Sequence, residues 1–275
     1  MNIFEKILYI LDSEMTSPTN YSWFHILFLL IVIGCTIFLC IHFKDCTEKT
    51  FNKIMLISWI VFVVLEIYKQ IIFTFEYSDG VVEWDYAWYS FPYQFCSSPI
   101  YVLPFIVFLK EGKLKDAFIS FMSTFVLFAG IAVMLYPNDV FCATIGINIQ
   151  TMIHHGLQVV LGIFCIVYNR DKYDLQYGLK ALYVFIPIVA IAMILNISVY
   201  HIFKANNIDD TFNMFYISPY FDCTLPVLSL IYPKVPYIVF LLIYFIGFSI
   251  INFIFHYASK FIINLTRKKK LSANQ

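Results

Sequence analysis

Charged residues are scarce in this chain of 275 residues. Asp, Glu, Lys and Arg together make up 13% of it, whereas apolar and aromatic residues make up 61%. A soluble domain carries about a quarter of its residues as charges. The composition therefore excludes an ordinary soluble domain. It predicts an all-α, multi-pass integral protein of the cell membrane.

The chain also lacks the patterns of several ligand sites. Its nine glycines form no phosphate-binding loop, and its seven cysteines include no CxxC pair and no metal-ligand spacing. The basic run at 267–270 directly follows an apolar segment, which indicates a membrane anchor rather than a nucleic-acid surface. We therefore expect no metal, no nucleotide or other cofactor, and no nucleic-acid partner.

Apolar runs of about 20 residues, the length that crosses a bilayer as a helix, recur along the chain. Seven membrane spans are predicted, at about 22–43, 52–75, 92–109, 116–136, 146–168, 180–203 and 236–258. No long polar linker separates them, so one domain over 1–275 is the simplest organisation. Residues 1–17 hold acidic side chains around a short apolar run, and we expect an interfacial helix there rather than a cleavable signal peptide.

Lysine and arginine are unequally distributed between the two ends of the predicted spans. The 18 basic and 18 acidic residues cancel in total. Three basic residues lie in each of the segments 44–53, 110–115 and 170–180, and five follow the last span. Because short cytoplasmic loops retain Lys and Arg, the N-terminus is predicted outside and the C-terminus in the cytoplasm.

Three reactive side chains fall at a similar depth in this topology. With a helical rise of about 1.5 Å per residue, Cys96 lies roughly 7 Å below the outer boundary, and His154 and His155 lie roughly 12 to 14 Å below it. A cysteine in the first turns of a helix is favoured as a thiolate, and histidine is the commonest general base. Simple packing is the alternative for Cys96. The two histidines point about 100° apart, so at most one faces a shared site squarely.

Other polar residues are expected in the same outer half of the bundle. Glu66 and Lys69 are three residues apart on one helix face and can form an ion pair. That pair either fixes helix packing or holds a lipid phosphate. The apolar connection 204–235 is expected to form an interfacial or re-entrant lid over this half. The residues expected to bind or orient a substrate are Gln94, Glu66, Lys69, Gln158, Asn196 and Asn213.

Three motifs carry a resemblance to a known family. They are Phe-Pro-Tyr-Gln-Phe-Cys-Ser at 91–97, Ile-His-His-Gly-Leu at 153–157, and Asn-Met-Phe at 213–215 with Pro219 and Leu225-Pro226 after it. This pattern resembles the YwaF-type integral membrane proteins of bacteria, whose eukaryotic relatives are transmembrane acyltransferases of ether phospholipids. In those relatives a cysteine of the third span and a histidine of the fifth are implicated in acyl transfer. By motif these fall on Cys96 and His155, with His154 as the neighbour. Gln94 departs from many bacterial members, which have histidine there.

Residues and resemblance together predict a phospholipid acyltransferase with a Cys nucleophile, a His base and a site in the outer half of the bilayer. Gln94 and Asn196 are expected to help stabilise the oxyanion. A lipid hydrolase would use the same residues. A transporter of a small solute or lipid, which buried Glu66 and Lys69 would fit, and a seven-helix sensor of unknown ligand are the alternatives. Membrane phospholipids are the expected partners.

Overall fold

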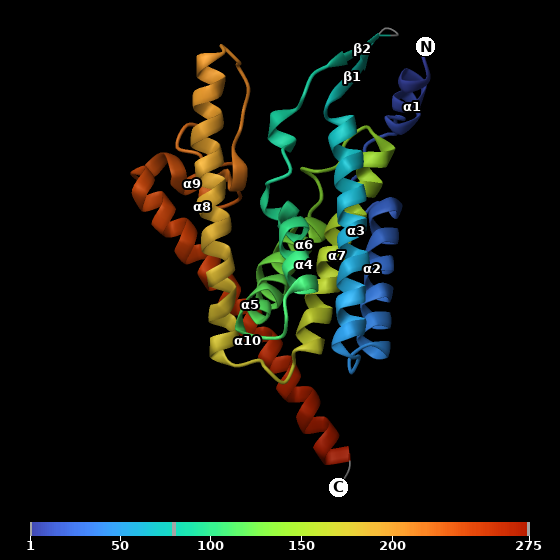
Figure 1. Cartoon of the computed structure of the whole chain (residues 1–275), viewed down its shortest axis with the longest axis vertical. Helices are drawn as coiled ribbons and strands as arrows, with labels where there is room; N and C mark the ends of the chain where they lie inside the picture. Colours follow the sequence, from blue (N-terminus) through green and yellow to red (C-terminus); the bar gives the residue numbers. More distant parts are fainter. Residues whose placement is uncertain (1, 79–80, 274–275) are drawn as a thin grey trace.

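The computed structural model describes residues 2–78 and 81–273, and 72% of the protein is helix. This confirms the all-α fold class. Within the described residues, six helical stretches are long and apolar enough to cross a membrane. They are α2 (Trp23–His42), α3 (Glu48–Ile72), α5 to α6 (Lys113–Leu135), α7 (Ile145–Tyr168), α8 (Leu175–Ala205) and the Tyr237–Leu265 part of α10 (Tyr237–Ala273). Figure 1 shows them as one elongated bundle.

The segment predicted as the third span has a different form. A 3₁₀ turn, η2 (Phe95–Ser97), leads into the short helix α4 (Ser98–Phe108), and residues 92–94 before them are not helical. The 11 residues of α4 reach about 16 Å, half of the ~30 Å hydrocarbon core. Pro99 lies at the N-terminal end of α4, the position where a missing N–H group costs least. The polypeptide therefore enters this part of the bundle as irregular backbone.

The remaining elements are short and lie mostly at one end of the bundle (Figure 1). Helix α1 (Ile3–Leu11), where a helix was predicted, begins with a capping box between Asn2 and Glu5. Strands β1 (Phe75–Ser78) and β2 (Val81–Trp84) form an antiparallel hairpin in which Phe75 pairs with Trp84. The 3₁₀ turn η1 (Trp88–Ser90) connects this hairpin to the start of the short third segment.

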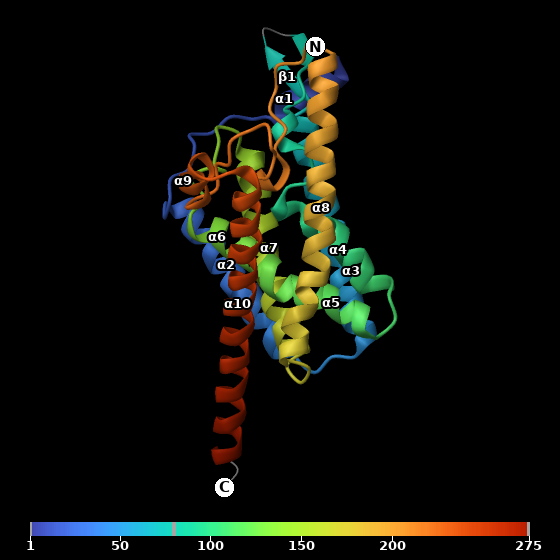
Figure 2. The same ribbon diagram turned by 90° about the vertical axis from the view of Figure 1, so that its left-hand side faces the viewer.

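The centre of the bundle is α7, which packs against α2, α3 and α6. Helices α8 and α10 lie on the other side (Figure 1). Helix α10 runs obliquely in that view and close to the long axis in the view of Figure 2. Helix α5 (Lys113–Phe121) joins α6 (Leu127–Leu135) through a buried π-helical turn at Met122–Val126 and packs against α8. Large apolar side chains on α2, α8 and α10 face outward, for example Leu30, Tyr183 and Ile246. These faces suit a lipid environment.

The connection between α8 and α10 folds back into the bundle. It contains the 3₁₀ turn η4 (Met214–Tyr216), α9 (Leu228–Ile231) and the 3₁₀ turn η5 (Tyr232–Lys234). Phe212, Met214 and Ile217 have no solvent-exposed surface, although none is in a long helix. Irregular backbone at this depth requires hydrogen-bonding partners from the protein itself.

A glycine allows the close approach of α6 to α7, and it provides a test of the fold. A Cβ atom added at Gly130 would lie 2.8 Å from the His155 carbonyl oxygen and 2.8 Å from Gln158 Cβ. Gly130→Ala is therefore expected to displace α7 and to destabilise the protein by about 1–3 kcal/mol. Gly34→Ala on α2, where nothing lies within 4 Å, is the control. Thermal unfolding in detergent measures both, and equal melting temperatures would contradict the close packing.

Candidate functional site

Cys96 lies in the η2 turn, at the middle of the bundle. The preceding residue, Phe95, anchors this turn. Its ring contacts those of Phe125, Phe185, Phe215 and Phe248 at centroid separations of 5.4–6.3 Å. Aromatic pairs at such separations stabilise by more than their buried area alone. The position of Cys96 is therefore fixed by packing from several elements.

Two side chains of α7 bind the carbonyl oxygen of Cys96. The Nε2 atoms of His154 and Gln158 lie 3.0 and 2.7 Å from it. Since a carbonyl only accepts, the neutral His154 ring carries its proton on Nε2, and its Nδ1 atom is a bare acceptor. That Nδ1 atom is buried and has no hydrogen-bond partner. The described residues show no hydrogen bond between the Cys96 thiol and either histidine ring.

His155 is turned along its own helix. Its Nδ1 atom donates to the Thr151 carbonyl oxygen at 2.8 Å, which leaves Nε2 as the bare nitrogen. The two histidine rings are 5.2 Å apart between centroids, and both are buried. The structure thus brings His154 to the backbone of the Cys96 turn. His155, which the family resemblance favoured as the base, lies directly beside it.

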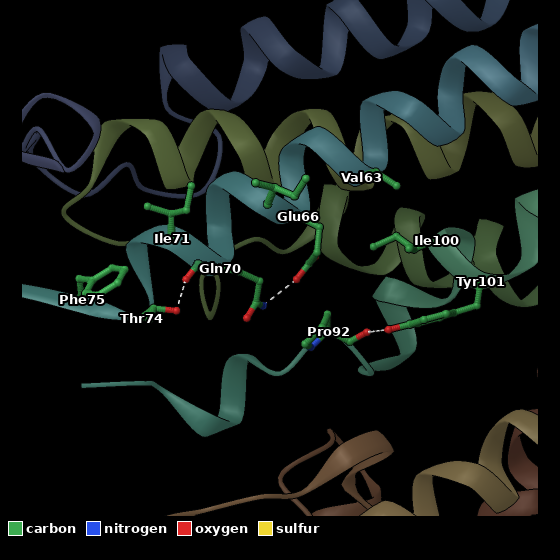
Figure 3. A pocket seen from close by; sticks show the side chains of 10 residues that line it. Val63, Glu66, Gln70, Ile71, Thr74, Phe75, Pro92, Ile100 and Tyr101 are labelled. Carbon is green, nitrogen blue, oxygen red and sulfur yellow. Dashed lines mark hydrogen bonds between the residues drawn. The ribbon is translucent and has the colours of Figure 1, made fainter. Parts of the chain in front are cut away.

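The ion pair expected between Glu66 and Lys69 is present, with Lys69 Nζ 2.7 Å from Glu66 Oε1. Gln70 Nε2 donates to the same oxygen at 2.8 Å and to the Ser90 carbonyl at 2.9 Å (Figure 3 draws the first of these bonds). The second carboxylate oxygen of Glu66 is buried without a partner. The charges of Lys69 and Glu66 both act on the Cys96 thiol.

Tyr86 completes this polar group from outside the spans. Its hydroxyl donates to Gln70 Oε1 at 2.7 Å. Burial raises the pKa of Tyr86, so the hydroxyl keeps its proton at neutral pH and remains a donor. Both the oxygen and the nitrogen of the Gln70 amide therefore form hydrogen bonds. These bonds fix the orientation of Gln70, and its bond to Glu66 fixes the position of that carboxylate.

The three amides Gln94, Asn196 and Asn213 hold the segment after α8. Asn196 Oδ1 accepts from the Met214 N–H at 2.7 Å, and its Nδ2 donates to the Met214 carbonyl at 2.9 Å. Gln94 likewise binds the Asn213 carbonyl and the Phe215 N–H, at 3.1 and 3.0 Å. Asn213 bridges the Asp222 carbonyl and the Ser218 N–H. Gln94 and Asn196 were expected to help stabilise an oxyanion, but here both ends of each amide bind backbone groups.

We call these three side chains, Gln94, Asn196 and Asn213, the amide clamp. The clamp supports a strained turn in the segment after α8. Phe215 and Tyr216 have φ angles of 58° and 56°, a conformation that costs roughly 1–2 kcal/mol for each non-glycine residue. The Phe215 ring lies 5.4 Å, between centroids, from the ring of Phe95, the residue before Cys96. Strain of this kind persists where the surroundings over-determine it, often at functional sites.

Two serines next to Cys96 belong to the site and were not predicted as site residues. The hydroxyls of Ser97 and Ser98 are buried. The Ser97 side chain forms a hydrogen bond with the Cys96 thiol, whereas the Ser98 hydroxyl has no hydrogen-bond partner in the described part of the chain. Hydroxyls are donors that can rotate toward a negatively charged oxygen. The signal was available in the sequence, because a Cys-Ser-Ser run in an otherwise apolar segment is itself unusual.

A family model described as the TMEM164 family matches residues 20–259, which include every site residue described above. No curated protein and no solved structure matches the chain.

Proposed function

The chain belongs to the TMEM164 family of transmembrane proteins, and from this premise we propose that it is an acyltransferase acting on membrane phospholipids through Cys96. One observation carries the proposal. The bare, unpartnered Nδ1 atom of His154 lies on the ring that binds the Cys96 backbone. A nucleophile with an adjacent base is the usual arrangement for covalent acyl transfer. The resemblance to YwaF-type proteins and to ether-phospholipid acyltransferases supports the same chemistry.

In the proposed first step, His154 Nδ1 takes the proton of the Cys96 thiol. The thiolate attacks the ester carbonyl carbon of a donor phospholipid, so that a C–S bond forms and the ester C–O bond breaks. The leaving alkoxide receives the proton from the imidazolium. The Ser98 hydroxyl, which has no partner in the described residues, donates to the oxyanion of the tetrahedral intermediate, and the Ser97 side chain stabilises the thiolate.

The second step reverses the first with a different alcohol. The hydroxyl of an acceptor such as a lysophospholipid gives its proton to His154 Nδ1 and attacks the thioester carbonyl. The C–S bond breaks, and the Cys96 thiolate recovers the proton. With water as the acceptor the same residues perform hydrolysis. In this scheme Gln158 positions the Cys96 turn, and Gln94, Asn196 and Asn213 hold the wall formed by 213–218.

We also propose that the short third segment completes a seventh crossing, with the N-terminus outside and the site in the outer half. The distribution of Lys and Arg supports this orientation. The ends of α3 and α8 nearest the site then face outward, as does the β1–β2 hairpin. Phospholipids of that leaflet are the proposed substrates.

The test is the intact mass of the purified protein in detergent after incubation with a mixed phospholipid extract. Wild-type protein should gain an acyl-sized mass that hydroxylamine removes, and Cys96→Ala should gain none. Cys40→Ala is the matched control, since Cys40 is also partly buried, and it should keep the adduct. Wild-type protein without an adduct, in a mixture whose lipids are unchanged, would refute the proposal and favour a transporter or a sensor.

A further inference from the structure

A groove runs along α3 between that helix and the segment 92–101. Its volume is 370 Å³, which lies within the roughly 300–1,000 Å³ usual for ligand sites. Two rows of side chains line it. Val63, Ile67 and Ile71 of α3 form an apolar row, and Glu66 and Gln70 of α3, followed by Thr74 just after the helix end, form a polar one. Figure 3 shows Glu66 and Gln70 directed toward the segment that holds Pro92 and Tyr101.

The groove extends over most of one leaflet. From Val63 to Ile71, α3 rises about 12 Å, compared with roughly 15 Å for half of the hydrocarbon core. Its side is open, since Ile67 on the apolar row is 55% exposed on the outer surface of a membrane span. One turn before Val63, Trp59 Nε1 donates to the Ile100 carbonyl at 2.9 Å and joins α3 to α4 there. The groove is thus open toward lipid along its side and bounded by a helix contact at its deep end.

The opposite wall is formed by residues of the segment that contains Cys96. Pro92 and Ile100, which line the groove, stand four residues before and four residues after Cys96. The Tyr101 hydroxyl donates to the Pro92 carbonyl and fixes the shape of this wall (Figure 3). Glu66, on the polar row, is among the residues whose charge acts on the Cys96 thiol. The groove therefore lies against the chain segment that holds the proposed nucleophile.

We propose that this α3–α4 groove binds one hydrocarbon chain of a membrane glycerophospholipid. The chain lies against Val63, Ile67 and Ile100, and the ester end lies toward Glu66 and Gln70. A phospholipid fits because it is an amphiphile that is present at the open side of the groove. The groove is apolar at its deep end, at Val63 and Ile100, and has polar side chains, Gln70 and Thr74, toward its other end. Delivery of the ester to Cys96 rests on the proposed acyl transfer, whereas binding of the chain does not.

The test uses a series of phosphatidylcholines that differ only in chain length, with bound lipid measured by native mass spectrometry. Val63→Phe should fill the deep end of the groove and lower binding of the longest chain about tenfold, which is the usual effect of a few methylenes in an apolar site. Val64→Phe is the control, because Val64 is 58% exposed and does not line the groove. Ile67→Phe, at an exposed groove position, is a second variant should Val63→Phe fail to fold.

The measurement is made on both wild-type and Cys96→Ala protein, so that binding and chemistry are separated. Chain-length selectivity that is the same in Cys96→Ala and is lost in Val63→Phe supports the groove, whether or not a thioester forms. Equal binding profiles for Val63→Phe, Ile67→Phe and Val64→Phe would overturn it. A Cys96 adduct in that case would leave the proposed acyl transfer standing without this groove.

Discussion

His154→Ala is expected to slow formation of the thioester at Cys96 by about 10²-fold or more, the usual contribution of a positioned general base. The reason is the proton arrangement of the ring. Nε2 donates to the Cys96 carbonyl at 3.0 Å, and this leaves Nδ1 as a buried bare nitrogen on the ring that binds the Cys96 backbone. A time course of intact mass with phospholipid measures the rate.

Two further variants test whether His154 is the general base, whether it only positions the Cys96 turn, or whether His155 is the base instead. His154→Gln restores an N–H donor for the Cys96 carbonyl but provides no base, so it should be as slow as His154→Ala. Recovery of the rate in His154→Gln would mean that the ring only positions the Cys96 turn. His155→Ala should slow the reaction much less, because the His155 ring binds the Thr151 carbonyl of its own helix. If His155→Ala proves the slower of the two alanine variants, the base is His155.

Asn196→Leu is expected to destabilise the protein by about 3 kcal/mol. Asn196 and Met214 are both 0% exposed, and the leucine has a similar size but no hydrogen-bonding groups. The Met214 N–H would lose its partner, and its carbonyl would retain only the long bond of 3.5 Å from Ile217. A buried polar group without a partner costs roughly 1–3 kcal/mol. Thermal unfolding in detergent measures the loss.

Asn206→Leu is the matched control for this substitution. Asn206 follows the end of the same helix, α8, and its side chain makes an exposed bond to the Ile202 carbonyl. Its replacement should change stability by about 0.5 kcal/mol or less. Equal shifts in melting temperature for Asn196→Leu and Asn206→Leu would show that the clamp on Met214 contributes little.

Hydropathy predicted the long helices closely because crossing a bilayer requires length and apolarity, both of which are properties of composition. The span expected at 22–43 is α2 at Trp23–His42, and the one expected at 146–168 is α7 at Ile145–Tyr168. The segment 92–109 is also mainly apolar, but only Ser98–Phe108 forms an α-helix. Hydropathy measures the transfer of side chains into lipid. It does not indicate where side chains such as Gln94 and Asn213 provide hydrogen bonds for backbone that is not helical.

The sequence indicated which residues belong to the site better than it indicated what each of them does there. Polar side chains in apolar spans are costly, so Cys96, His154 and Asn196 stood out in the sequence. Which histidine meets the Cys96 turn depends on the rotation of α7, which neighbours such as Gln158 do not determine. The amides illustrate the same limit. Asn196 and Gln94 bind backbone more than 15 residues away in the chain, and such pairs leave no local pattern in a single sequence.

The returning segment after α8 also sets an order of events during synthesis. The Cys96 turn and the histidines of α7 are made early, but the residues clamped by Asn196 and Gln94, at 213–215, leave the ribosome after α8 is complete. Domains assemble from the N-terminus as the chain emerges. We expect a nascent chain ending at 205 to contain inserted helices around a nucleophile whose covering wall is still absent.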